Sequence, residues 1–193
     1  MPTTGVELDS ERLKLRALRP GDAAPIAILV NDWEVVRYTT SIPYPYDVDM
    51  ARDFIASQAK RWAAWRPGLP LVEEIAFAIE RKSDHELVGC IGLQPGERQG
   101  LEFGYWIGKT YWNRGYASEA VGRLTRFAFE TLGIDEIWAA AVPVNDASHR
   151  VLEKNGFAIA GAGTRESEIR GHSLPVITRK LSRAQWLAAH PRG

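Results

Sequence analysis

The stretch YWNRGYASEA, residues 111–120, joins an apolar segment predicted to be a strand to the longest helix predicted in the second half of the chain. Gly115 permits a tight turn and a close approach of a ligand to the backbone, and the small Ala117 leaves room in the same way. The first amides of a helix have no partners within the helix, and the helix dipole favours an anion there. A diphosphate therefore fits this loop. A glycine before a helix also marks an ordinary turn, so this stretch alone leaves both interpretations open.

On both sides of this stretch, the spacing of apolar residues predicts an alternation of strands and helices. Capping residues support the helix starts, among them Asp22, Asp47, Asn145 and the Ser182–Gln185 capping box. The order indicates a mixed α/β fold built on one sheet. The strands are predicted over residues 12–18, 75–80, 86–93, 101–107, 134–142, 157–160 and 174–180, and the longer helices over 22–31, 47–65, 115–132 and 145–156.

Composition excludes several classes of protein. The chain has 193 residues, enough for one domain, and its 24 Lys and Arg balance 24 Asp and Glu. Proteins that bind nucleic acid usually carry a basic excess, so a nucleic-acid partner is not expected. Apolar runs are too short for a membrane span, and the first residues lack a signal-peptide pattern. The single cysteine, Cys90, is expected to be buried in a strand, which fits a reducing cytoplasm.

A second dense motif, residues 143–157 with the sequence PVNDASHRVLEKNGF, follows the predicted strand 134–142. Asn145 begins a helix and Ser148 lies three residues on, so that both side chains share one face of the first turn. They can serve as local caps, or they can form a polar pair that points into a cleft between the fourth and fifth predicted strands. The four histidines have no metal-ligand spacing, and no metal site is predicted.

Further segments stand in a fixed order with these two motifs, namely SERLKLR at 10–16, GD at 21–22 and FGYWI at 103–107, ahead of the loop at 111–120 and the helix with its turn at 145–157. Taken in this order, the segments resemble the GNAT superfamily of acetyltransferases, in the RimJ/RimL-like branch that includes the ribosomal-protein N-terminal acetyltransferases. One departure concerns Trp112, because the general superfamily pattern has Gln or Arg at that position; an aromatic residue there is similar to this particular branch.

The resemblance implies a single N-acetyltransferase domain over residues 1–193, with a core at about 10–182. It also implies a central mixed, mostly antiparallel sheet of about seven strands that splays between the fourth and fifth strands and is flanked by helices.

The same resemblance implies acetyl-CoA as the co-substrate, with its pantetheine arm in the gap between the splayed strands. Backbone groups near Trp106 and Ile107 would hold the arm and polarise the thioester carbonyl, and Asn145 would bond to the arm. A neutral amine would attack the thioester directly in a ternary complex, without an enzyme nucleophile. The pyrophosphate contacts are implied for Asn113, Arg114, Gly115, Tyr116, Ala117 and Ser118.

Direct attack requires a base for the amine and an acid for the leaving thiolate. Glu102 is the candidate base, directly or through a water, because it shares a strand face with Gly104, which leaves room for an acceptor. The alternative is an exposed or salt-bridged carboxylate. Ser148 is the candidate acid, or a hydrogen-bond donor to the sulfur. Tyr105 and Tyr116 are weaker candidates for the acid and are expected to pack in the core.

The acceptor amine is expected to enter between residues 38–47 and the loop 161–173, where mixed charges fit a protein N-terminus, an antibiotic amine and a small metabolite amine equally. Two other functions fit the sequence, namely a non-catalytic CoA-binding sensor or scaffold and a transferase for another acyl-CoA. A homodimer is compatible with the sequence, which does not determine the oligomeric state.

Overall fold

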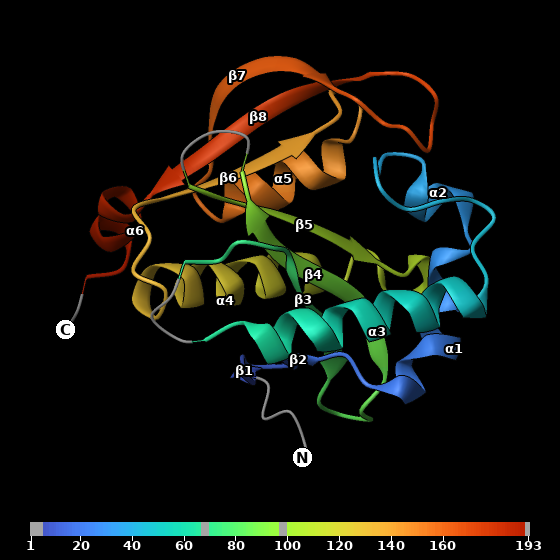
Figure 1. The fold of residues 1–193 in the computed structure, drawn as a ribbon. Coiled ribbons are helices and arrows are strands. Elements are labelled where there is room, and N and C mark those ends of the chain that lie inside the picture. Colours follow the sequence, from blue (N-terminus) through green and yellow to red (C-terminus); the bar gives the residue numbers. More distant parts are fainter. Residues whose placement is uncertain (1–5, 67–69, 97–99, 192–193) are drawn as a thin grey trace.

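An open sheet of eight strands forms the centre of the fold, in the order β1-β2-β3-β4-β5-β6-β8-β7 (Figure 1). The computed structural model describes residues 6–66, 70–96 and 100–191. Neighbouring strands are antiparallel except β5 and β6, which are parallel. The strands are β1 (Leu8–Asp9), β2 (Leu13–Ala17), β3 (Ile75–Arg81), β4 (Leu87–Pro95), β5 (Leu101–Ile107), β6 (Glu136–Ala141), β7 (Ala158–Arg165) and β8 (Leu174–Ser182). The α-helices are α1 (Ala23–Val30), α2 (Trp33–Val36), α3 (Val48–Ala64), α4 (Tyr116–Glu130), α5 (Asp146–Lys154) and α6 (Arg183–Ala189).

The mixed, mostly antiparallel sheet confirms the predicted fold class, with three corrections of detail. The additional strand is β1, which has two residues and is too short to give a periodic signal. β7 extends to Arg165, so the loop predicted over residues 161–173 is confined to 166–173. Asp22 does not cap α1 with its side chain, which instead accepts hydrogen bonds from Arg16 and from the backbone N–H of Arg19.

The two faces of the sheet carry side chains of different size, and different helices cover them. Along β3, Phe77 and Ile79 belong to a core that includes α4, which we call the α4-side core. The alternate residues Ala76 and Ala78 belong to a core with α1, α2 and α3, the α3-side core. Because successive side chains of a strand point to opposite faces, small residues on one face let helices approach closely while large ones fill the other.

β5 and β6 are paired at only two positions, Leu101 with Ile137 and Glu102 with Trp138, and then diverge. On the other side of β5, pairing with β4 continues along the whole strand. A Cβ atom at Gly89 would lie 2.2 Å from the carbonyl oxygen of Trp106, so only glycine allows this approach of β4 to β5. The sheet is therefore continuous up to β5 and splayed beyond it, as predicted.

A buried ionic cluster joins β2, β3 and the turn before α1. The guanidinium of Arg16 donates two hydrogen bonds to Asp22, at 2.8 and 2.9 Å, and one to Glu80 at 2.5 Å. All three side chains are buried. Burial opposes ionisation of Glu80, but Arg16, His85 and Arg19 outweigh burial and lower its pKa. Arg16 thus compensates two carboxylates that have little contact with water.

Replacement of Arg16 should destabilise the fold strongly. We expect Arg16→Met to reduce the free energy of unfolding by about 3–5 kcal/mol, because it leaves two buried carboxylates without their cation. The matched control is Arg19→Met, which removes a cation 3.8 Å from Glu80 that is mostly exposed; its cost should stay below about 1 kcal/mol. Urea unfolding measures both values, and similar losses for the two variants would contradict the assignment.

Candidate functional site

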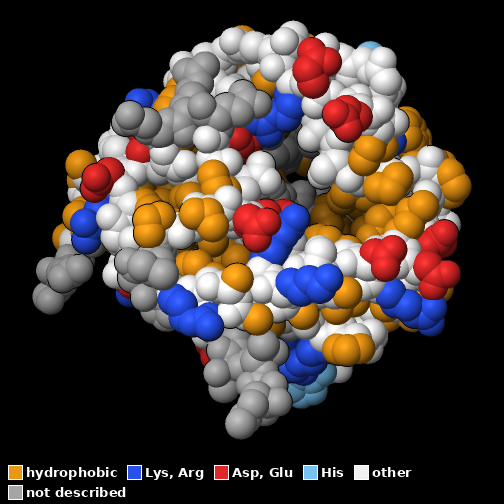
Figure 2. Space-filling model, in the orientation of Figure 1, with side chains coloured by type: hydrophobic (Ala, Val, Ile, Leu, Met, Phe, Trp, Pro, Cys, Tyr) orange, Lys and Arg blue, Asp and Glu red, His pale blue; other side chains and the backbone are white. Residues whose placement is uncertain are grey.

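A cleft of about 1080 Å³ occupies the region where β5 and β6 part, and Figure 2 shows the face of the molecule hollowed beside α2 and α3. Its lining includes the starts of α4 and α5, the inner part of β5, and the segment between α2 and α3. Arg114 is exposed and is not among the lining residues. The predicted site residues that line the cleft are Glu102, Trp106, Ile107, Asn113, Gly115, Tyr116, Ala117, Ser118, Asn145 and Ser148.

The loop before α4 is shaped by two residues with positive φ, Asn113 at 59° and Gly115 at 80°. Asn tolerates this left-handed conformation better than most residues, and Gly adopts it without a steric cost. The indole N–H of Trp112 donates to the carbonyl of Ile107 at 2.7 Å and fixes the loop to the end of β5. The aromatic residue that departs from the general superfamily pattern thus has a structural role here.

Arg12 and Glu119 hold the start of α4 against the N-terminal strands. The Arg12 side chain donates to the carbonyl of Arg114 at 2.9 Å and to Glu119 at 2.8 Å, and it lies over the ring of Tyr116. Glu119 also accepts hydrogen bonds from the Ser10 hydroxyl and the Arg12 backbone N–H. The carboxylate of Glu119, in the first turn of α4, is therefore held by Ser10 and Arg12 at one side of the helix start. Sequence reasoning did not identify this clamp, which joins segments 107 residues apart.

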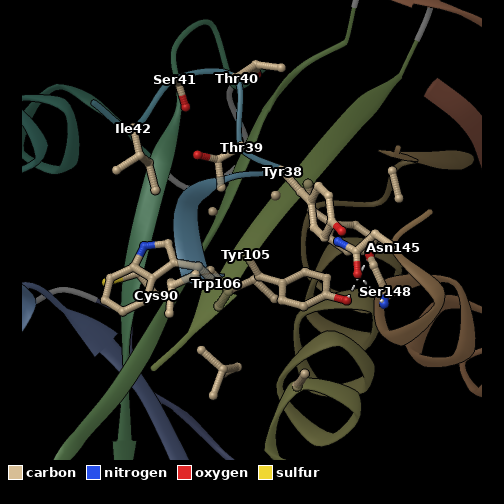
Figure 3. Close-up of a pocket in the computed structure, with 18 of the residues that line it drawn as sticks. Tyr38, Thr39, Thr40, Ser41, Ile42, Cys90, Tyr105, Trp106, Asn145 and Ser148 are labelled. Carbon is tan, nitrogen blue, oxygen red and sulfur yellow. Dashed lines mark hydrogen bonds between the residues drawn. The ribbon is translucent and has the colours of Figure 1, made fainter. Parts of the chain in front are cut away.

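At the start of α5, Asn145 and Ser148 act as the predicted cap. The Asn145 side-chain oxygen accepts the Ser148 backbone N–H at 3.2 Å, which leaves the amide group of this side chain outside the cap. The Ser148 hydroxyl lies 3.1 Å from the Tyr105 hydroxyl, and Figure 3 shows the Tyr105 ring extending toward Ser148. Burial raises the pKa of Tyr105 to about 12, so its hydroxyl stays protonated at neutral pH. Two neutral hydroxyl groups thus form a hydrogen-bonded pair in the cleft.

Successive side chains of β5 point to opposite faces of the sheet, so the cleft is lined by residues from both faces. Tyr105 packs against the α4-side core and Trp106 against the α3-side core. In Figure 3 their side chains point in different directions, Trp106 toward Ile42 and Cys90. The hydroxyl pair therefore lies on one side of the splayed sheet, and Trp106 lines the other.

Glu102 is buried and forms a salt bridge. A salt-bridged carboxylate was part of the predicted alternative to a base, whereas the exposure that was also considered there is not found. Its two carboxylate oxygens accept hydrogen bonds from Arg165 at 2.5 and 2.8 Å. Arg165 stands at the end of β7, on the far side of β6 and β8 in the sheet order, and sequence reasoning did not connect the two residues. A Cβ at Gly104 would meet nothing within 4 Å, so there is open space beside this pair, as predicted.

The loop after β7 is tied across the cleft to the segment after α2. Ser167 donates to the carbonyl of Thr40 at 2.8 Å, and Arg170 donates to the carbonyls of Val36 and Ile42 at 2.7 and 3.0 Å. Arg170 also lies over the ring of Trp33. The two segments predicted to surround the acceptor are thus joined to each other.

The described ranges contain no group of three or more His, Cys, Asp or Glu side chains arranged to hold a metal ion. Within the same ranges, each helix is too short or too polar to cross a bilayer.

Comparison with known proteins identifies the fold and its relatives. Residues 12–158 match the family described as acetyltransferase (GNAT) domain. The uncharacterized N-acetyltransferase YoaA of Bacillus subtilis (strain 168) is 31% identical over 156 residues, which cover 80% of this chain and 84% of the relative.

Two solved structures share the fold at lower identity. Mycobacterium smegmatis RimJ in complex with CoA-disulfide has a TM-score of 0.78 and 21% identity, with 99% of this chain and 97% of that chain covered. Spermidine N-acetyltransferase from Vibrio cholerae, in complex with CoA and spermine, has a TM-score of 0.73 and 22% identity, with 92% and 99% covered.

The clamp at the start of α4 should stabilise the protein in a pH-dependent way. Burial opposes ionisation of Glu119, but the Arg12 backbone N–H, Ser10 and the Arg12 side chain outweigh burial and lower its pKa below the ordinary 4.5. A lowered folded-state pKa gives stability that is present above the unfolded-state pKa and is lost as the pH falls through the folded-state value. We expect Glu119→Gln to reduce the free energy of unfolding by about 1–3 kcal/mol at pH 7. This loss should shrink as the pH falls from the unfolded-state pKa of Glu119 through its folded-state pKa.

Urea unfolding at a series of pH values tests this expectation. Glu130→Gln is the control, because Glu130 pairs with Arg126 on the surface in the last turn of the same helix. Its cost should stay near about 0.5 kcal/mol or less. A loss in Glu119→Gln that is independent of pH would show that the charge of Glu119 is not what stabilises the helix start.

Proposed function

This chain belongs to the family of GNAT acetyltransferase domains, and we propose that it passes the acetyl group of acetyl-CoA directly to a primary amine bound in the cleft. Membership makes it an acyl-CoA-dependent N-acetyltransferase. Binding of acetyl-CoA in this cleft, which the proposal requires, is supported by one observation above all: the starts of α4 and α5 line the same cleft where β5 and β6 diverge.

The start of α4 has the features that a diphosphate requires. Its first amides have no partners within the helix, and the positive φ of Gly115 turns the chain into the helix in one residue. Arg12 bonds to the Arg114 carbonyl and to Glu119 and so holds the loop against the first turn of α4, and the basic side chains of Arg150 and Lys154 line the cleft from α5. We assign the amides of residues 115–118 to the diphosphate of coenzyme A, with Asn113 and Arg114 shaping the loop.

The unpaired part of β5 suits an extended arm. Its backbone groups near Trp106 and Ile107 lie where β6 has moved away, so an arm in the gap can replace the missing strand. The carbonyl of Ile107 already accepts a hydrogen bond from the Trp112 indole. We therefore assign hydrogen bonding to the arm to the other backbone groups of this part of the strand. Asn145 adds a donor from its side-chain amide, which its cap does not use. Acetyl-CoA supplies an acetyl group activated as a thioester.

The chemistry needs one proton removed and one delivered. In the transfer a bond forms between the amine nitrogen and the acetyl carbon, and the carbon–sulfur bond breaks. An ammonium acceptor loses two protons overall, one to solvent and one to the sulfur. We assign the delivery to Ser148, with Tyr105 hydrogen-bonded behind it and protonated at neutral pH.

We assign to Glu102 the role of the base that removes a proton from the amine, directly or through a water. Arg165 occupies both of its oxygens, but each oxygen of a carboxylate can accept a further hydrogen bond. An α-amine with a pKa of about 7.7–8.0 loses a proton near neutral pH far more readily than a lysine amine at about 10.4. An α-amine therefore needs a weaker base than a lysine amine, which suits a carboxylate that is already paired with Arg165.

Thermal and urea unfolding with acetyl-CoA test the cofactor assignment. At about 100 times the dissociation constant, acetyl-CoA should stabilise the wild-type fold by about 2.7 kcal/mol. Gly115→Val should lose most of this stabilisation, because valine cannot adopt a φ of 80° without strain and its Cβ would meet Arg12 at 3.3 Å. The control is Gly133→Val, which has a φ of 66° and no atom within 4 Å of the added Cβ.

The comparison separates backbone strain from ligand contact. Both variants lose intrinsic stability, but only Gly115→Val should lose the response to acetyl-CoA. An equal stabilisation of both variants by acetyl-CoA would contradict the assignment of the diphosphate to the start of α4. No response in the wild-type protein would overturn the proposed function.

Ser148→Ala tests the proton donor. We expect kcat to fall about 100-fold, a typical value for loss of a general acid, with acetyl-CoA binding retained. Tyr105→Phe should have a smaller effect in the same direction. Tyr111→Phe is the control, because that hydroxyl donates to Glu86 instead. Thiol release in single turnovers measures the rate, and an unchanged rate in Ser148→Ala would contradict the assignment.

A further inference from the structure

The face of β4 and β5 that is turned toward α3 forms a floor in the cleft. Trp106 and Cys90 belong to the α3-side core, and alternate residues of each strand share their face. On this face, three cross-strand pairs line the cleft, namely Gln94–Glu102, Gly92–Gly104 and Cys90–Trp106. The floor therefore runs from a polar end at Glu102, over two glycines, to an apolar end at Trp106, which lies about 13 Å farther along the strand.

This floor and the walls beside it suit a hydrocarbon body. A Cβ atom at Gly104 would meet nothing within 4 Å, so the middle of the floor is open. Burial of apolar surface against apolar walls stabilises a bound molecule. The apolar lining of this part of the cleft comes from α1, α2 and α3 and the segment between the last two, with Ile26, Val30, Val35, Ile42 and Phe54.

Tyr46 brings a hydroxyl group into this apolar region. The residue is 8% exposed and lines the cleft. In the part of the chain that the structure describes, Tyr46 makes its hydrogen bond through the backbone N–H, and the hydroxyl has no partner. Unlike the indole N–H of Trp65, the hydroxyl is not sealed off in the core, so a molecule in the cleft can reach it. Burial raises the pKa of Tyr46 to about 12, so the hydroxyl is a neutral donor at neutral pH.

Trp106 places a second donor at the same end of the floor. Its indole N–H also has no hydrogen-bond partner among the described residues. Figure 3 shows the indole with its nitrogen on the side of Ile42. An indole nitrogen donates and does not accept. A molecule that displaces water from this end leaves two donors unsatisfied unless it offers an acceptor atom of its own.

The charges around this end favour an uncharged acceptor atom. Arg37 and Arg61 lie 3.1 and 3.0 Å from Glu34 and Glu74, so their charges are already compensated. A carboxylate on the ligand would find these cations paired and would lie near the negative charge of Asp53, which acts on Tyr46. A second ammonium group would face the indole N–H and would lose its water among apolar side chains.

We propose that the acceptor is an apolar primary amine with an uncharged, hydrogen-bond-accepting oxygen at the end remote from the amine. The inference rests on the proposed function and names the substrate class for the same site. The amine would lie near Glu102 and the hydrocarbon body over the glycine pair. The oxygen would accept hydrogen bonds from the Tyr46 hydroxyl and the Trp106 indole. Tyr105 packs on the opposite face of β5, so the amine and the proton donor would approach the thioester from different sides.

Matched amines on the unmodified protein test the inference. Para-methoxyphenethylamine is compared with para-ethylphenethylamine, which has a methylene group in place of the ether oxygen, and N-acetylcadaverine is compared with octylamine. The amine groups are alike within each pair, so the comparison isolates the tail. With saturating acetyl-CoA, kcat/KM for the oxygen-bearing member of at least one pair should be about tenfold higher, because its carbon isostere leaves the donors unsatisfied.

Three further acceptors test charge and size. Cadaverine and aminocaproate carry an ammonium and a carboxylate at the remote end, and both should react at least about tenfold more slowly than N-acetylcadaverine, because apolar walls penalise a charge. A tetrapeptide amide should also react more slowly than the oxygen-bearing amines. Ser167 and Arg170 join the loop after β7 to the segment after α2, and a polypeptide would have to pass between these two segments.

Tyr46→Phe connects the preference to one hydroxyl group. It should lower kcat/KM for the oxygen-bearing amine more than for its carbon isostere, so that their ratio falls toward one, while acetyl-CoA still stabilises the protein against unfolding. Tyr44→Phe is the matched control, because Tyr44 stands two residues earlier, is 47% exposed and is not among the lining residues. Its ratio should equal that of the unmodified protein.

The outcomes separate this inference from the proposed function. If acetyl-CoA binds, the inference is overturned by equal or faster acetylation of both carbon isosteres, by faster acetylation of a charged-tailed amine or the peptide amide, or by acetylation of none of these amines. A preference for oxygen that persists in Tyr46→Phe overturns the role of Tyr46. No stabilisation by acetyl-CoA and no thiol release with any acceptor overturns the proposed function itself.

Discussion

The parting of β5 and β6 after two paired residues is the constraint on which the rest of the structure depends. Two parallel neighbours that separate leave backbone N–H and C=O groups of β5 without a strand to bond to, and such groups need a partner or water. Each of the two strands leads into a helix, so the starts of α4 and α5 open toward the same gap. The divergence of β5 and β6 thus brings the unpaired edge of β5 and the unpaired amides of two helix starts into one cleft.

A splayed sheet needs ties that keep its two halves at a fixed distance. Asn155, at the end of α5, donates its side-chain amide to the carbonyl and hydroxyl oxygens of Ser118 at 3.2 Å. A Cβ at Gly122 would lie 2.9 Å from the Asn155 side chain, so glycine is what lets the two helices approach. This contact joins the start of α4 to the end of α5, and the Arg12–Glu119 clamp joins the same helix start to the N-terminal strands, so the start of α4 is held from both sides.

Sequence patterns predicted the elements that depend on neighbouring residues. The caps at Asp47 and Asn145 and the capping box at Ser182 are local hydrogen bonds, and the structure confirms them. The splay and the order of motifs came from the resemblance to a family. What could not be predicted are contacts between distant residues, such as Glu102 with Arg165, which are 63 positions apart. Alternation indicated which face Glu102 occupies, but no local pattern encodes which cation reaches that face across two other strands.

The two ends of the cleft differ in how their charges are arranged, and this difference can orient the substrates. At one end, the amides at the start of α4 and the side chains of Arg150 and Lys154, in the middle and at the end of α5, supply positive potential to the lining, which Asp146 in the first turn of α5 offsets only in part. At the other end, the described cationic side chains of the lining are paired with carboxylates at close range, as in Arg61–Glu74. An anionic diphosphate therefore gains most at the first end and little at the second. Under the proposed function, a thioester carried by such an anion would extend along β5 toward Glu102, and the acceptor would approach from the other end of the cleft.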